Sequence, residues 1–212
     1  MKHLLRLTAA VALPVGVLAA TGGVAAAGNH KTDASQASIT CTSVDGALKF
    51  APGLVPGGTL PGNVNVKLLV SGCTVTGAPG VEIAFGTLSA SLYIPNNDAS
   101  LLLGSTAVSG SADIHWKTSA GKLAWPKSTV TVSTVVGAAA ADGYGSITIA
   151  PGTASVAGDF AGTDAGASSS LYAESLDTVA QLGNRTTGKG GLNHITIGTG
   201  ATHTTGNQLT LG

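Results

Sequence analysis

Asp113 and His115 are the residues whose types and spacing come closest to catalytic chemistry. They stand two positions apart in an alternating stretch, so both face the same side of a predicted strand, about 7 Å from each other. With a serine they would supply the groups of a hydrolytic triad. However, side chains that stand perpendicular to a sheet do not easily reach each other, and no Gly-x-Ser-x-Gly elbow joins a strand to a helix. We therefore expect a solvated outer face and no catalytic residue.

Trp125 is the weak candidate for ligand binding. It precedes Pro126 in a predicted loop, where an exposed indole would stack on a sugar ring. A loop tryptophan also often covers a core, and both interpretations stay open. Trp116 shares a strand face with Ile114, and we expect it to pack in the core.

Metal sites and paired-carboxylate catalysis find little support in the sequence. The mature part has four scattered histidines, which are His30, His115, His194 and His203. They lack the short spacing of zinc ligands. Only two glutamates occur, and the aspartates follow no EF-hand pattern. We therefore expect no metal and no cofactor.

Cys41 and Cys73 are the two cysteines of the chain. Neither belongs to a CxxC motif or has a histidine nearby, which disfavours a redox pair and a metal site. In an oxidising compartment an even count predicts a disulfide. The bond would close a loop of 33 residues, worth about 3–4 kcal/mol in the chain-entropy model.

The N-terminus predicts export. Lys2 and Arg6 form a short positive region before an apolar stretch, residues 7–20, and small residues follow at positions 25–27. The stretch is shorter than the roughly 20 residues that span a bilayer, although an N-terminal anchor is the alternative. We expect residues 1–27 to be a general secretory signal peptide cleaved near Ala27. Residues 28–38 would then be a disordered lead-in and residues 39–212 a single extracellular domain.

Charge is sparse and balanced in this sequence. Charged residues make up 9% of the chain and aromatic residues 4%. Without Lys2 and Arg6, eight basic residues stand against ten acidic ones. This balance gives no electrostatic case for binding nucleic acid or an anionic membrane surface.

Short segments of period two run from Ile39 onward, separated by glycine and proline. The clearest alternations are in residues 63–70, 113–118, 129–136 and 146–149. A change of parity after Gly86 predicts a β-bulge. Several short strands without amphipathic helices between them predict an all-β fold. The expected form is an antiparallel β-sandwich, Ig-like or jelly-roll-like, or a related barrel.

One segment near the C-terminus has helical spacing instead. Residues 175–183 predict a short helix, with Ser175 as the N-cap and Gly183 as the stop. Alternation returns in residues 195–197 and 209–211, which indicates a final hairpin or a closing strand. The Gly/Ser/Ala-rich stretch 161–170 has the composition of a linker.

Several motifs resemble those of a group of small secreted β-rich proteins of actinobacteria. The motifs are Ser38-Ile39-Thr40-Cys41, Val70-Ser71-Gly72-Cys73-Thr74, Ile114-His115-Trp116-Lys117-Thr118 and Gly191-Leu192-Asn193-His194-Ile195. The resemblance covers most of the mature chain and rests on a cysteine pair, a tryptophan strand and turn residues. It implies secretion and a β-rich fold, and it lends no catalytic residue.

These observations predict a secreted, non-enzymatic protein that acts through surface contacts. The expected partner is the cell envelope or an extracellular polysaccharide, with no nucleic acid and no membrane span after signal cleavage. Two alternatives stay open: a secreted hydrolase that uses Asp113 and His115, and a self-associating structural protein of the surface. The sequence indicates no oligomeric state.

Overall fold

The computed structural model describes residues 37–124, 127–139, 143, 145–161, 167–172, 179–198 and 207–212. The predicted signal peptide, most of the lead-in and Trp125 lie outside these ranges. The elements are β1 Ser38–Leu54, β2 Gly62–Thr76, β3 Phe85–Ile94, the 3₁₀ turn η2 Ala99–Leu102, β4 Ser105–Lys117, β5 Ser128–Ala139, β6 Gly145–Ile149, β7 Ala154–Gly158, β8 Ala167–Tyr172, α1 Val179–Thr186, β9 Leu192–Ile197 and β10 Gln208–Leu211.

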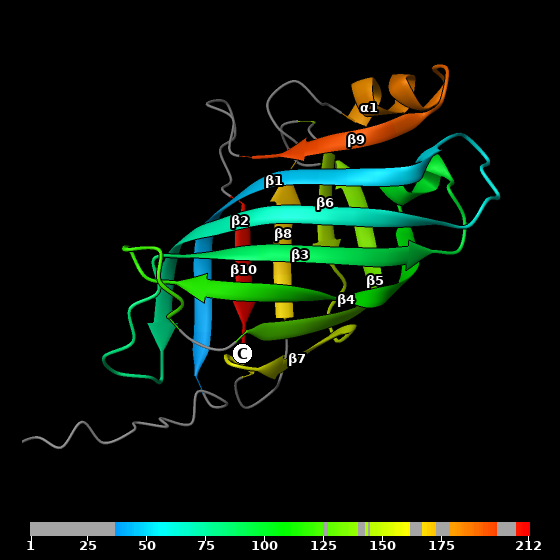
Figure 1. Cartoon of the computed structure of the whole chain (residues 1–212). Coiled ribbons are helices and arrows are strands. Elements are labelled where there is room, and N and C mark those ends of the chain that lie inside the picture. Colours follow the sequence, from blue (N-terminus) through cyan, green and yellow to red (C-terminus); the bar gives the residue numbers. More distant parts are fainter. Residues whose placement is uncertain are drawn as a thin grey trace, which may run out of the picture. The chain divides into compact units, whose positions relative to one another are not determined.

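The strands join one antiparallel sheet that curls and closes on itself. Hydrogen-bonded neighbours follow the order β10-β8-β6-β5-β4-β3-β2-β1-β9, and β7 adds to β5. β10 also pairs with β1, where Leu211 stands opposite Ile39. This pairing completes a ring of eight strands, which leaves β7 and β9 outside it. In Figure 1, β1 to β4 run side by side, while β8 and β10 cross them at a steep angle.

The prediction of an antiparallel all-β fold with one short helix near the C-terminus is confirmed. Two separate sheets, as in a sandwich, are not observed among the described strands, because all of them belong to the same curled sheet. The alternation of the sequence reports which face of a strand is buried. It does not report whether that face looks at a second sheet or at the far side of its own sheet.

β1 bends and pairs with two strands along one edge. Residues 39–41 pair with β10, and residues 46–49 pair with β9. Gly46 stands where the partner changes and has a φ of +151°. A Cβ on Gly46 would lie 2.1 Å from the carbonyl oxygen of Lys67 on β2. Glycine therefore lets β1 bend without separating it from β2.

The end of the ring near Trp116 is packed solid. Trp116 and Phe160 are both fully buried, and their rings meet edge to face with centroids 5.4 Å apart. Trp116 Nε1 donates a hydrogen bond to Ser128 Oγ at 2.8 Å, and Ser128 Oγ donates to the carbonyl oxygen of Asp159. The predicted core position of Trp116 is confirmed.

The change of parity that predicted a β-bulge after Gly86 arises at the start of β3, because Val81 and Ile83 precede the strand. β3 begins at Phe85 and keeps a continuous register with β2 and β4 from there on, so the bulge prediction is wrong. A Cβ on Gly86 would lie 2.8 Å from two ring carbons of Trp116. The glycine therefore provides space for the indole.

The helix near the C-terminus differs from its prediction at its end. α1 continues through Gly183, where a stop was expected, because the burial of Leu182 offsets the roughly 1 kcal/mol that an internal glycine costs. The Gly/Ser/Ala-rich stretch 161–170, which has the composition of a linker, contains part of β8, and this strand pairs with β6 and β10. Its serines and alanine are weak strand formers, so composition concealed it. No helix among the described residues is long and apolar enough to cross a membrane.

Candidate functional site

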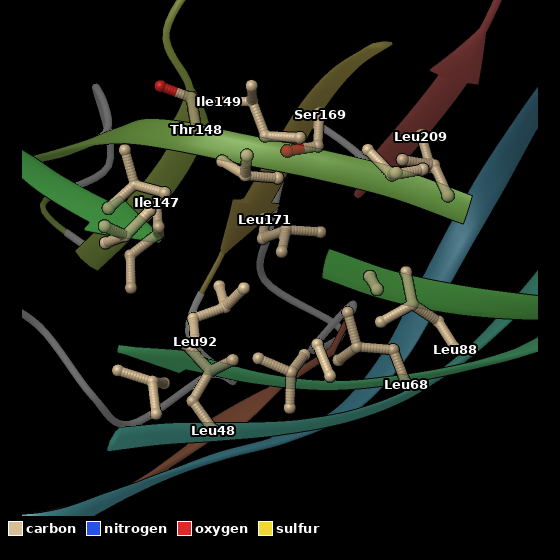
Figure 2. A pocket seen from close by; sticks show the side chains of 18 of the residues that line it. Leu48, Leu68, Leu88, Leu92, Ile147, Thr148, Ile149, Ser169, Leu171 and Leu209 are labelled. Carbon is tan, nitrogen blue, oxygen red and sulfur yellow. The ribbon is translucent and has the colours of Figure 1, made fainter. Parts of the chain in front are cut away.

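A cavity of about 100 Å³ lies inside the ring of strands. All eight strands of the ring contribute side chains to its lining, and η2 adds Leu101. Figure 2 shows Leu68 and Leu88 on one side of the cavity, with Leu171 and Leu209 on the other. Protein interiors contain few voids larger than a water molecule, so a hollow of this size is a specific feature of the fold.

The hollow results from small side chains at matched positions on four neighbouring strands. Val66, Ala90, Ala112 and Val130 stand opposite one another on β2, β3, β4 and β5, and we call them the waist row. An eight-stranded ring is just wide enough for its own side chains to fill the interior or for one small ligand to occupy it. With two alanines in the waist row, the side chains leave the centre open.

The lining is almost purely aliphatic. None of the described residues that form it is ionisable, and only Thr148 and Ser169 carry a hydroxyl. Thr148 Oγ1 donates to the carbonyl oxygen of Val136 at 3.4 Å, and Figure 2 shows it pointing away from the cavity. Ser169 stands opposite Leu209 on β10 and therefore shares its inward face. Ser169 is the one described hydroxyl directed at the cavity.

η2 and the β1–β2 loop meet at the end of the ring opposite Trp116. Asn97 is buried; its Nδ2 donates to the Gly53 carbonyl oxygen at 2.8 Å, and its Oδ1 accepts from the Leu60 backbone at 3.0 Å. Asp98 Oδ1 accepts from the backbone N–H groups of Ser100 at 3.2 Å and Gly57 at 3.1 Å. The Ser100 hydrogen bond, followed by the one from Gly57, lowers the pKa of Asp98. These contacts tie the β1–β2 loop to η2.

Asp113 and His115 lie on the outer face of β4, away from the cavity. Asp113 accepts hydrogen bonds from Lys127 Nζ at 2.9 Å and from Thr129 Oγ1 at 2.8 Å. The Lys127 bond, followed by the Thr129 bond, lowers the pKa of Asp113. The outer face predicted for these residues is confirmed, and Asp113 is oriented by Thr129 on β5 and by Lys127 instead of by His115.

Cys41 and Cys73 form the predicted disulfide and stand directly opposite each other on β1 and β2. In the part of the chain that the structure describes, no three histidine, cysteine, aspartate or glutamate side chains are placed to hold a metal ion. The candidate stacking residue, Trp125, is not among the described residues, so its role stays a prediction.

No protein-family model, curated protein or solved structure matches this chain. The resemblance to secreted actinobacterial proteins stays a prediction. The cavity was missed by sequence reasoning, although one signal for it exists. Ala90 and Ala112 occupy inward positions of consecutive strands where the neighbouring inward residues are leucine, valine and isoleucine.

Proposed function

We propose that this protein is a secreted, non-enzymatic binding protein that holds a small apolar molecule inside its ring of strands. The observation that carries the proposal is the cavity of about 100 Å³ with its aliphatic, uncharged lining. Pockets for small molecules are concave and mostly apolar, with few polar groups, and the mouths and interiors of closed sheets are common places for them.

The free-energy cost of the hollow supports a role for it. Cavities in protein cores cost about 24 cal/mol per Å³, so an empty volume of 100 Å³ costs about 2.4 kcal/mol of stability. One larger side chain at Ala90 or Ala112 would remove most of that cost. A bound molecule offsets it equally well, and the two alanines of the waist row are consistent with such an occupant.

The volume limits the size of the buried part of the ligand. An apolar cavity of about 150 Å³ accommodates benzene, so a cavity of 100 Å³ suits about four to six carbon atoms. At about 0.8 kcal/mol for each buried methylene, the expected binding free energy is about 3–5 kcal/mol. That corresponds to a Kd of about 0.2–6 mM for a fragment of this size.

The test is a titration of the purified protein with n-pentane and with benzene, followed by methyl NMR. Saturable shifts are expected for the methyl groups of Leu68, Leu88 and Leu171, which line the cavity. Val156, a buried residue that does not line it, serves as the internal control and should not shift. Methyl signals that stay unchanged up to the solubility limit of both probes would exclude ligand binding in the ring.

Export from the cell is part of the proposal. The Cys41–Cys73 disulfide is the kind of bond that persists in oxidising compartments, and the N-terminal segment has the pattern of a secretory signal. A hydrolase centred on Asp113 is not proposed, since its carboxylate is engaged by Lys127 and Thr129 on a convex outer strand face.

A further inference from the structure

The chemistry of the lining restricts the charge of the ligand. Every described residue around the cavity is uncharged. A carboxylate or ammonium group placed there would lose its hydration without gaining a counter-ion, at a large cost in free energy. The buried part of any ligand must therefore be neutral.

The extent of the lining restricts the shape of the ligand. Val64, Val66 and Leu68 line the cavity along β2, and Leu88 and Leu92 line it along β3. Four residues of strand span about 13 Å. The volume of about 100 Å³ suits four to six carbon atoms, so the buried part of the ligand fills only a portion of that length. A short aliphatic chain fits this volume, whereas a fused ring system exceeds it.

Ser169 supplies the one polar group that a neutral chain would meet. Its hydroxyl makes no hydrogen bond to the residues that the structure describes, unlike that of Thr148, which is taken up by the Val136 carbonyl oxygen. Ser169 is half-buried and stands beside Leu171 and Leu209, which both face the cavity. A hydroxyl in an apolar wall is unfavourable unless a partner reaches it. A ligand oxygen would provide that partner.

We infer that the ligand class is a neutral aliphatic chain with one hydrogen-bonding oxygen, such as an alcohol or an ester, whose oxygen bonds to Ser169 Oγ. This inference rests on the proposed binding function and adds the chemical class of the ligand and the residue that recognises it. A site that selects free fatty acids would differ from this one, because it would need a cationic side chain to pair with the carboxylate.

The experiment compares three probes of equal chain length: n-pentane, 1-pentanol and pentanoate at pH 7.5. Each is titrated into the wild-type protein, into Ser169→Ala and into Thr148→Val, with Kd read from methyl NMR. Thr148→Val is the matched control, because it also removes a hydroxyl from a lining residue but not one directed at the cavity.

We expect Ser169→Ala to weaken the binding of 1-pentanol about 3- to 10-fold, because one neutral hydrogen bond is lost. The same substitution should change the Kd of n-pentane by less than about 2-fold. Thr148→Val should leave the pentanol-to-pentane ratio unchanged. Pentanoate should bind at least about 100-fold more weakly than 1-pentanol, because the lining offers no counter-ion. The inference would be overturned if Ser169→Ala weakened the binding of pentane and pentanol equally, or if pentanoate bound as tightly as pentanol. Either result would leave the proposed binding of apolar molecules intact. Failure of all three probes to bind would overturn the proposed function itself.

Discussion

Ala112→Leu should make the protein more stable, which is unusual for an enlargement of a core residue. Ala112 lies in the waist row opposite Ala90 and Val130, with its side chain at the edge of the cavity. The substitution adds three carbon atoms, worth about 2.4 kcal/mol at 0.8 kcal/mol each. The ordering of the longer side chain subtracts about 0.5–1 kcal/mol. The expected gain is therefore about 1.5–2 kcal/mol, within the 2.4 kcal/mol attributed to the empty volume.

Equilibrium urea denaturation measures this gain directly. The midpoint should rise with an unchanged m-value, and Tm should increase by about 3–8 °C for a domain of this size. The same variant should bind n-pentane at least about 10-fold more weakly, because its side chain occupies the site. Ala157→Leu on β7 is the control: Ala157 is exposed, so the change in stability should stay within about 0.5 kcal/mol.

A loss of stability in Ala112→Leu would refute the reasoning. Side chains forced into a well-packed core usually cost about 1–3 kcal/mol. A destabilisation of that size, with Ala157→Leu unchanged, would mean that the waist of the ring is already filled. The volume would then offer no space to a ligand.

Three further predictions concern other parts of the fold. Gly86→Ala should lower the free energy of unfolding, measured by urea denaturation, by about 1–3 kcal/mol, because a Cβ there meets the Trp116 ring at 2.8 Å. It should also alter the near-UV circular dichroism, and an unchanged spectrum would contradict this packing. Burial raises the pKa of Asp159, so its contribution to stability is full below about pH 4 and is lost as pH rises through the folded-state pKa. Asp159→Asn should flatten this decline of stability with pH, and a parallel decline in both proteins would refute it. Replacing Cys41 and Cys73 with serine should lower the free energy of unfolding by about 2–4 kcal/mol, and reducing agent should destabilise only the wild type.

The sequence predicted the strands better than their arrangement. Alternation correctly identified the buried face of β2, where Val64, Val66, Leu68 and Val70 point inward. It also indicated the disulfide and the outer position of Asp113. Alternation is a property of one strand, whereas closure of the ring depends on pairing between β1 and β10 at opposite ends of the chain.

The candidate site was beyond the reach of the same reasoning for a physical reason. A cavity is defined by side chains that are too small for the space between strands, and that space follows from the curvature of the sheet. Ala90 and Ala112 look like ordinary small residues until their register places them side by side. Ser169 lies in a stretch with the composition of a linker, and its inward position follows from the pairing of β8 with β10 opposite Leu209.

The seam between β1 and β10 also determines when the interior becomes enclosed. Thr40 and Thr210 are 170 positions apart, yet their hydroxyls lie 3.3 Å from each other. Contacts this distant in sequence form late, because the entropy of closing a long loop must be overcome first. Until β10 docks, the edges of β1 and β8 are open and the leucines and valines of the interior face solvent. An apolar molecule that meets the chain at this stage shields those side chains and is enclosed when the last strand docks. Folding in the presence of ligand should therefore load the protein more completely than adding ligand to the finished ring.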